Sequence, residues 1–145
     1  MSRYVSPDVR REVAARADFL CEYCLIAEED TFFGCEVEHI ISLKHGGPSE
    51  LANLAYACAF CNRHKGSDVG SVSAAGEFSR FFNPRTDRWS GHFRLVATAI
   101  QPLTVIGEVT ARILRLNHTD QLLERDRLMS VGRYPNEAAS ARMKA

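Results

Sequence analysis

The stretch YACAFCNRHKG, residues 56–66, holds two cysteines in a C-x-x-C arrangement, and four polar residues follow the second cysteine without a gap. A second C-x-x-C pair stands earlier in the chain, at Cys21 and Cys24, and 33 residues separate the two pairs. Four thiolates can complete the tetrahedral shell of one Zn²⁺, and such a closed shell leaves no open position for a substrate. We therefore predict a structural zinc bound by Cys21, Cys24, Cys58 and Cys61, which would hold the two ends of the intervening segment together.

The composition is that of a globular chain in a reducing compartment. Its 145 residues are 46% hydrophobic and 25% charged, which suits one domain with room for an appended subdomain. No apolar run approaches the ~20 residues of a membrane span, and residues 1–11 lack the apolar core of a secretory signal. We expect a cytoplasmic protein without a membrane partner. Of the five cysteines only Cys35 is outside the pairs, and we expect it to be a small buried apolar residue.

The charges are unevenly distributed although the net charge is zero. Residues 1–76 carry 7 Lys and Arg against 11 Asp and Glu, whereas residues 77–145 carry 11 against 7. Contact with a polyanion should therefore favour the second half. An excess of arginine is also typical of an ordinary solvated surface, so charge alone leaves both interpretations open.

The first half predicts a helix, two strands and a helical turn. Ser6 is a suitable N-cap, and Pro7 and Asp8 fit the first turn of a helix whose apolar residues recur at helical spacing. Aromatic and β-branched residues favour a strand within residues 32–41 and a shorter one within residues 53–57. A helical turn should then begin near the last cysteine of the second pair.

The composition shifts after residue 65. Glycine and serine dominate residues 66–77, which we interpret as a linker or a surface loop. This stretch divides the chain into a core, residues 1–66, and a C-terminal extension, residues 67–145. The apolar run within residues 81–100 favours a strand after a proline-containing turn.

The extension should end in helices. Trp89 and Phe93 are expected core residues. Apolar residues at helical spacing predict a helix capped by Thr104 that runs through Leu116, and Thr119 should cap a second, short helix. The tail after Pro135 is expected to be frayed.

Between the cysteine pairs lies EVEHIISLKHGGPSELANL, residues 36–54. Together with those pairs it resembles the HNH endonucleases of the ββα-metal superfamily. The shared pattern is C-x-x-C, an acidic residue and His at a strand end, a Gly-Gly turn, Asn-Leu, and C-x-x-C followed by His or Asn and a Lys. The matching residues are Cys21, Cys24, Glu38, His39, Gly46, Gly47, Asn53, Leu54, Cys58, Cys61, Asn62 and Lys65. The resemblance covers residues 21–66, about a third of the chain.

The resemblance implies a small zinc-stapled ββα-metal core. Together with the elements predicted before and after it, this gives an α+β fold in which the core is flanked by an N-terminal helix and a C-terminal strand-plus-helices extension. The resemblance also implies that His39 is the general base, that Asn53 orients the loop and His39, and that Glu38 and Asn62 ligate one divalent cation. A neutral imidazole, with an ordinary pKa near ~6.5, can act as a base at neutral pH. Glu38 replaces the more usual Asp, and Asn62 stands where many members have His. Oxygen ligands of this kind favour Mg²⁺ or Mn²⁺ over Zn²⁺ or Ni²⁺.

Each of these residues also has a structural interpretation. Glu38 is compatible with a solvated strand carboxylate, His39 with a core histidine, and Asn53 with an ordinary turn residue. Asn62 can cap the helical turn after the second cysteine pair. His64 should point away from the face that carries Asn62, which favours a phosphate contact or a surface position over metal ligation.

The expected function is a metal-dependent endonuclease that hydrolyses DNA, with RNA left open as a substrate. We expect nucleic-acid contacts from seven basic residues: Arg63, His64, Lys65, Arg80, Arg85, Arg88 and Arg94. The alternative is a non-catalytic, zinc-stabilised module that binds nucleic acid or protein. A zinc-stabilised scaffold would be favoured if the extension covered the metal site.

Overall fold

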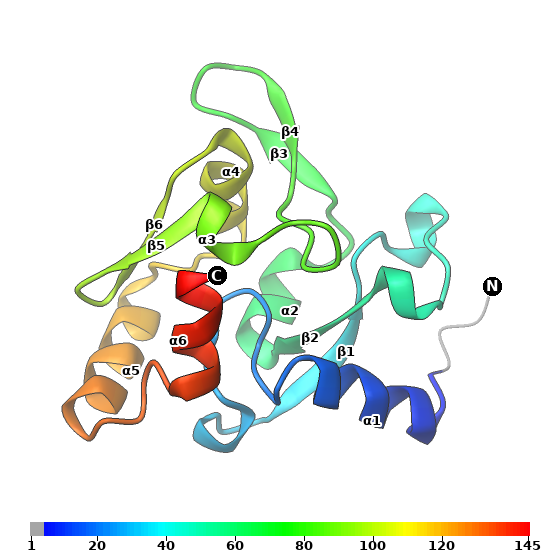
Figure 1. Cartoon of the computed structure of the whole chain (residues 1–145). Coiled ribbons are helices and arrows are strands. Elements are labelled where there is room, and N and C mark those ends of the chain that lie inside the picture. The colour runs from blue at the N-terminus through cyan, green and yellow to red at the C-terminus, as the bar shows by residue number, and fades with distance from the viewer. Residues whose placement is uncertain (1–4) are drawn as a thin grey trace.

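The structure is a computed structural model, and it describes residues 5–145 (Figure 1). The helices are α1 (Pro7–Arg16), α2 (Ala59–Lys65), α3 (Trp89–His92), α4 (Val105–Ile113), α5 (Thr119–Ser130) and α6 (Glu137–Lys144). The strands are β1 (Cys35–His39), β2 (Leu54–Cys58), β3 (Gly70–Val72), β4 (Phe78–Arg80), β5 (Phe93–Val96) and β6 (Ala99–Pro102). The strands pair as three antiparallel hairpins, so the predicted α+β class is confirmed. Within residues 5–145, every helix is too short or too polar to cross a lipid bilayer.

The hairpin β1–β2 lies between two helices (Figure 1). On one face, Val37 of β1 and Leu54 of β2 pack against α1. Side chains alternate along a strand, so Glu36 and Glu38 point to the other face, where α2 lies. In the register of the hairpin, His39 pairs with Leu54 at the end of β1. The arrangement β1–β2–α2 is thus a ββα unit with α1 behind it.

The N-terminal helix begins as the sequence predicts. The Ser6 hydroxyl accepts a hydrogen bond from the Val9 amide at 3.2 Å, and Pro7 is the first helical residue. Val13 and Ala17 are fully buried on the face that packs against the hairpin. The cap and the apolar spacing together fix the position of this helix.

The first strand is shorter than predicted. Strand β1 begins only at Cys35, whereas Phe32 and Phe33 lie in the preceding loop with exposed fractions of 91% and 79%. Gly34 separates them from the strand with a φ of 75°, a left-handed conformation that interrupts extended backbone. Phe32 and Phe33 therefore lie outside the sheet.

The glycine- and serine-rich stretch contains regular structure. Strand β3 lies within residues 66–77, and β4 follows directly after them. The two strands form a hairpin that packs on α4. The Ala74 amide donates a hydrogen bond to Glu108 of α4 at 2.8 Å. One hydrophobic core includes Tyr23 from the first half and Trp89 and Tyr134 from the second. The division into residues 1–66 and 67–145 stays a prediction, although both parts share this core.

The middle of the extension follows the sequence pattern closely. Trp89 and Phe93 are 4% and 1% exposed, which confirms them as core residues. Thr104 caps α4 as predicted, because its hydroxyl accepts a hydrogen bond from the Gly107 amide at 3.0 Å. The helix nevertheless ends at Ile113 instead of Leu116, since Arg115 adopts a φ of 54°.

The ends of the last two helices differ from the predictions. Helix α5 is capped by the His118 ring, whose Nδ1 accepts from the Asp120 amide at 3.1 Å, and Thr119 is its first helical residue. The prediction of a frayed tail is wrong. Helix α6 packs on α3 and β5, and its Ala139 is fully buried. This tertiary packing, which no local pattern announces, holds the C-terminal residues.

Asp87 gives the extension a pH-dependent contact. Its carboxylate accepts hydrogen bonds from the Arg80 guanidinium at 2.7 and 3.0 Å, which holds the pKa of Asp87 below its usual value. The ionised carboxylate therefore stabilises the fold above the unfolded pKa of about 3.9, and this contribution is lost as the pH falls through the lower, folded pKa.

Asp87→Asn should reduce the free energy of unfolding at neutral pH by less than about 1 kcal/mol, because the Arg80 side chain is 51% exposed and solvent screens the pair. This reduction in the free energy of unfolding should become smaller at pH values below the pKa of Asp87 in both the folded and the unfolded state. Urea unfolding of both proteins across the acid range measures it. An equal loss at neutral and strongly acidic pH would show that the charge of Asp87 is not the cause.

Candidate functional site

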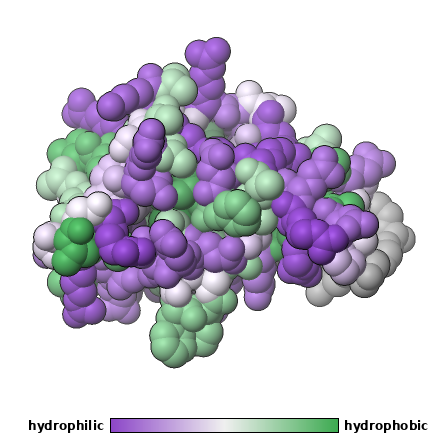
Figure 2. Space-filling model, turned by 60° about the horizontal axis from the view of Figure 1, so that its bottom comes forward, coloured by the Kyte–Doolittle hydropathy of each residue, from purple (hydrophilic) through white to green (hydrophobic). Residues whose placement is uncertain are grey.

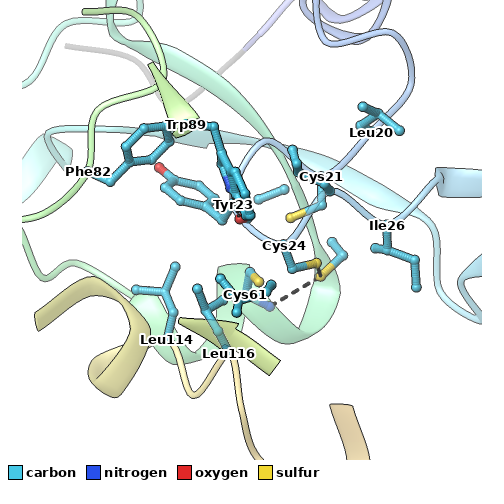
Figure 3. Close-up of a cluster of buried hydrophobic side chains, with 14 of the residues drawn as sticks. Leu20, Cys21, Tyr23, Cys24, Ile26, Cys61, Phe82, Trp89, Leu114 and Leu116 are labelled. Atoms are coloured by element: carbon cyan, nitrogen blue, oxygen red, sulfur yellow. Dashed lines mark hydrogen bonds between the residues drawn. The ribbon is translucent and has the colours of Figure 1, made fainter. Parts of the chain in front are cut away.

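The four paired cysteines meet in the core. Their sulfur atoms all lie within 4.8 Å of one another, and all four residues are buried (Figure 3). The Sγ atoms of Cys24 and Cys58 are 3.8 Å apart. Sulfur ligands at about 2.3 Å from a tetrahedral zinc lie about 3.8 Å from each other, so the spacing suits one Zn²⁺. The predicted four-cysteine cluster is confirmed, and Cys35 stays outside it, half-buried beside β2.

The second cysteine knuckle, residues 58–61, is formed by the start of α2. Cys58 is the N-cap of this helix, and its Sγ accepts a hydrogen bond from the Cys61 amide at 3.4 Å. Hydrogen bonds from the Cys21 and Cys24 thiols hold the pKa of Cys58 well below its usual value. The same contacts raise the pKa values of Cys24 and Cys61, so a proton is lost more readily from Cys58 than from these two neighbours, and a thiolate is the form that binds metal.

The extension braces the first cysteine knuckle, residues 21–24. The Trp89 indole donates a hydrogen bond to the Tyr23 carbonyl at 2.8 Å, and the Tyr134 hydroxyl donates one to the Cys24 carbonyl at 2.8 Å. Figure 3 shows Trp89 and Tyr23 packed beside the cysteines. The metal-binding geometry of this knuckle therefore depends on residues far along the chain.

The loop after β1 is shaped by two glycines and an asparagine. Gly46 has a φ of 84°, in the left-handed region, and a Cβ on Gly47 would lie 1.7 Å from the Ile41 carbonyl oxygen. The buried Asn53 side chain accepts from the Ile41 amide and donates to the carbonyls of Ile41 and Pro48, each at 2.9 Å. Its amide thus clamps both ends of the loop that follows His39.

His39 lies at the last position of β1, where that loop begins. Its Nε2 is 2.8 Å from the Ser49 hydroxyl, and the tautomer of the ring decides which group donates. The side chain is half-buried and borders a hollow of about 400 Å³. The strand register and the Ser49 contact together restrict the orientation of the imidazole.

The hollow brings the predicted catalytic residues together. It is lined by Val5, Arg10, Val37, Glu38, His39, Ser42, Leu43, Asn62, Arg63, Gly66 and Ser67. Glu38, His39 and Asn62, three of the four residues to which the resemblance assigns a role in catalysis or metal binding, are among them. The fourth, Asn53, holds the loop that follows His39. Two exposed arginines, Arg10 of α1 and Arg63 of α2, also border the hollow. Arg10 was not predicted as a site residue, because it lies outside residues 21–66, which carry the resemblance to the HNH endonucleases.

Glu38 is held from the interior. Its side chain is 3% exposed, accepts a hydrogen bond from the Tyr23 hydroxyl at 2.8 Å, and forms an ion pair with Lys65. Burial raises the pKa of Glu38, whereas Lys65 and Tyr23 oppose the rise. The carboxylate therefore links the first cysteine knuckle to α2 while it borders the hollow.

Lys65 requires a correction. The prediction that it contacts nucleic acid is wrong, because its side chain is 1% exposed and points into the core. Besides the Glu38 ion pair, its ammonium donates hydrogen bonds to the carbonyls of His39 and Ile40 at 3.2 and 3.0 Å. It fixes the backbone at the end of β1, which is a positioning role.

Asn62 lies one helical turn before the end of α2. Its Nδ2 donates a hydrogen bond to Glu36 Oε2 at 2.8 Å. This contact uses the amide nitrogen, and the amide oxygen, the atom that can bind a cation, accepts no hydrogen bond from another side chain among residues 5–145. Glu36 was not among the predicted residues, although its alternation with Glu38 on β1 was a usable signal.

A comparison with protein families matches residues 21–68 to the model of the HNH endonuclease family. Residues 21–68 are therefore similar to an HNH endonuclease domain. The match contains both cysteine pairs, the clamped loop and the predicted site residues Glu38, His39 and Asn62, which border the hollow. The same comparisons found no matching curated protein and no matching solved structure.

The other predicted nucleic-acid residues of the first half, Arg63 and His64, lie on α2. The Arg63 guanidinium is 5.9 Å from the centre of the Phe60 ring. The His64 ring also stacks on Phe60, at 4.2 Å between centroids, and its Nδ1 is 2.9 Å from the Phe60 carbonyl. The His64 ring thus contacts its own helix, whereas Arg63 borders the hollow.

The four arginines of the extension that were predicted to contact nucleic acid divide into two pairs. Arg80 binds Asp87, and Arg85 forms an ion pair with the buried Glu22, so both are engaged by carboxylates of the chain. Arg88 and Arg94 are exposed, and neither borders the hollow. Their contact with nucleic acid stays a prediction.

Proposed function

We propose that this chain is a metal-dependent HNH endonuclease that hydrolyses phosphodiester bonds of DNA, and that its four-cysteine cluster binds a structural zinc. The observation that supports the proposal most is the shared hollow, in which Glu38, His39 and Asn62 lie together beside two arginines. A structural clip alone does not need a histidine, a carboxylate and an amide at one opening.

His39 is the proposed general base. Hydrolysis of a phosphodiester needs a group that takes a proton from the attacking water, and a neutral imidazole does this at neutral pH. The Ser49 contact orients the ring, and Lys65 holds the carbonyl of the same residue. Asn53 fixes the loop that closes behind it. The base is therefore positioned directly by Ser49 and Lys65 and indirectly by the loop that Asn53 holds.

Glu38 and Asn62 are the proposed ligands of a catalytic Mg²⁺ or Mn²⁺. Their donor atoms are a carboxylate and an amide oxygen, and such hard donors suit these cations. When bound, the cation supplies charge stabilisation at the scissile phosphate and at the leaving oxygen. Because Lys65 already neutralises much of the Glu38 charge, we expect weak affinity, in the range where added cation controls the rate.

Arg10 and Arg63 are the proposed phosphate contacts. Both are exposed and border the hollow from opposite sides, one on α1 and one on α2. A guanidinium pairs with two phosphate oxygens at once, which would place a nucleic-acid strand across the opening. The positive charge at this site is local, since the first half of the chain is acidic overall.

One observation favours a second candidate, a non-catalytic nucleic-acid-binding module. Glu38 is buried and paired with Lys65, a state that satisfies the carboxylate without a cation. In that case the arginines would bind nucleic acid, but added Mg²⁺ or Mn²⁺ would leave the substrate intact. The metal titration described next separates the two candidates.

Asn62→Ala should raise the Mn²⁺ concentration needed for half-maximal nicking of supercoiled plasmid, with partial rescue at high Mn²⁺. Removal of one oxygen ligand weakens binding of the cation before it alters the chemistry. Asn62→Asp is the matched variant: it keeps an oxygen donor and should need less Mn²⁺ than Asn62→Ala. Identical Mn²⁺ titrations of the wild type and both variants would remove Asn62 from the proposed ligand set.

Replacement of Arg10 and Arg63 by glutamine should weaken DNA binding and reduce the slope of its salt dependence by about 2, because each phosphate contact contributes about one unit. The control is Arg88→Gln with Arg94→Gln, a pair of equal charge away from the hollow. Fluorescence anisotropy of a labelled duplex across salt concentrations measures both slopes. A reduced slope in the control pair alone would assign the phosphate contacts to the extension instead.

A further inference from the structure

A second surface feature lies on the loop between the first cysteine knuckle and β1. Phe32 and Phe33 are 91% and 79% exposed, and their rings pack edge to face at 4.8 Å between centroids. The loop lies at the bottom of Figure 1, and Figure 2, which brings that side forward, shows a hydrophobic projection there. Single exposed apolar residues are common, but two adjacent exposed phenylalanines form a patch that indicates an interaction site.

A hollow of about 250 Å³ lies next to this pair of rings. Its apolar lining comes from the loop and from the start of α2, and it includes Ile26, Phe33, Ala59 and Phe60. The first turns of α5 form the other side. The exposed rings and the hollow thus make one continuous surface, which we call the phenylalanine surface.

The charged rim of the phenylalanine surface is negative. Asp120 and Glu124 of α5 line the hollow, one helical turn apart, and no lysine or arginine among residues 5–145 lines it. The Asp120 side chain is 77% exposed, and its only described ion-pair partner is the His118 ring at 3.7 Å. Glu124 forms no ion pair among the described residues. Both carboxylates are therefore available to a cationic group.

We propose that the phenylalanine surface docks a segment of another protein that carries a large apolar side chain next to an arginine or lysine. The apolar side chain would pack against Phe33 and Phe60, and the cationic group would pair with Asp120 and Glu124. The methylene groups of an arginine or lysine also pack well on phenylalanine rings. Nucleic acid does not suit this surface, because its phosphates would face the two carboxylates.

The docking surface and the proposed catalytic hollow occupy opposite ends of α2. Cys58, Ala59 and Phe60 border the first, whereas Asn62, Arg63 and Gly66 border the second. A helix of this length spans about 10 Å. A segment bound to the phenylalanine surface leaves the catalytic hollow open, so the partner would bring the chain to a location instead of blocking it.

The test begins with a phage-displayed library of random short peptides selected on the full-length, zinc-loaded chain. Selected peptides should combine a large apolar residue with an arginine or lysine. Resynthesised with a fluorescent label, they should bind Phe33→Ser and Glu124→Gln at least about tenfold more weakly than the wild type, as central contacts of an interface do. Both residues lie at the surface, and unchanged zinc content and thermal midpoint would show that the variants are folded.

Phe78→Ser is the matched control, since Phe78 is 68% exposed on β4 and does not line the hollow. It should bind the peptides as the wild type does, and so should His39→Ala, because docking is independent of cleavage. Equal binding to Phe33→Ser, or selected peptides without basic residues, would overturn the proposal. Displacement of the peptide by a short DNA duplex would overturn it as well. So would a dimer in sedimentation that Phe33→Ser abolishes, since a second copy would then cover the surface.

Discussion

His39→Ala should lower the turnover of DNA cleavage by about 10² to 10⁴-fold, the usual contribution of a positioned base. Folding and zinc content should stay unchanged, because the imidazole is half-buried and borders a hollow instead of the core. The wild-type rate should rise with pH and level off once the imidazole is neutral, and the variant should lack this rise. Initial rates of plasmid nicking at saturating Mn²⁺, measured across pH, give both results.

The matched control is His45→Ala, an exposed histidine in the loop that follows β1. It should retain the rate and the pH profile of the wild type, since it does not border the hollow. If His39→Ala kept its activity with an unchanged pH profile, the base would have to be another group.

Cys58→Ser should abolish stable folding of the region around the four cysteines. The four sulfurs come from two knuckles at opposite ends of a long insert, and zinc binding at comparable sites contributes on the order of 10 kcal/mol at neutral pH. That is similar to the whole stability of an ordinary domain. Cys58 is also the N-cap of α2, so the variant loses a ligand and weakens the helix that carries Asn62. Zinc analysis and thermal unfolding by circular dichroism measure the effect.

The control is Cys35→Ser, which alters a half-buried cysteine outside the cluster. It should retain zinc and lose far less stability than Cys58→Ser. Wild-type protein purified without tightly bound zinc, or Cys58→Ser as stable as the wild type, would exclude a structural zinc.

The parts of the site that depend on local spacing were predictable from the sequence. Two C-x-x-C pairs imply four thiolates at one point, and they do cluster. The adjacent Gly46 and Gly47 predicted a tight turn. In the structure Gly46 is left-handed and Gly47 lies close to the backbone of Ile41. Asn53 was expected to orient that loop, and its three hydrogen bonds connect the two ends; its catalytic relevance stays a proposal.

The burial of Lys65 was not predictable in the same way. A lysine near the end of a polar stretch suggests a solvent-facing cation, and only the packing of α2 on β1 turns it toward Glu38. The same limitation applies to Arg85, whose partner Glu22 is 63 residues away along the chain. Ion pairs between distant segments have no signature in local sequence.

The C-terminal tail shows the same dependence on distant contacts. A short polar segment after Pro135 lacks a strong apolar period, which favoured a frayed end. In the structure, Arg142 of α6 donates a hydrogen bond to the Arg16 carbonyl, and Tyr134 reaches the Cys24 carbonyl. Helix α6 is therefore stabilised by the first half of the chain, and sequence periodicity could not reveal it.

The most direct test of the proposed activity is nicking of supercoiled plasmid by zinc-loaded wild-type protein in buffer freed of other divalent cations. Cleavage should be absent at first, should appear on addition of Mg²⁺ or Mn²⁺ in proportion to the protein, and should be nearly lost in His39→Ala prepared in parallel. Equal cleavage by His39→Ala, or intact plasmid at every concentration of either cation, would contradict the account.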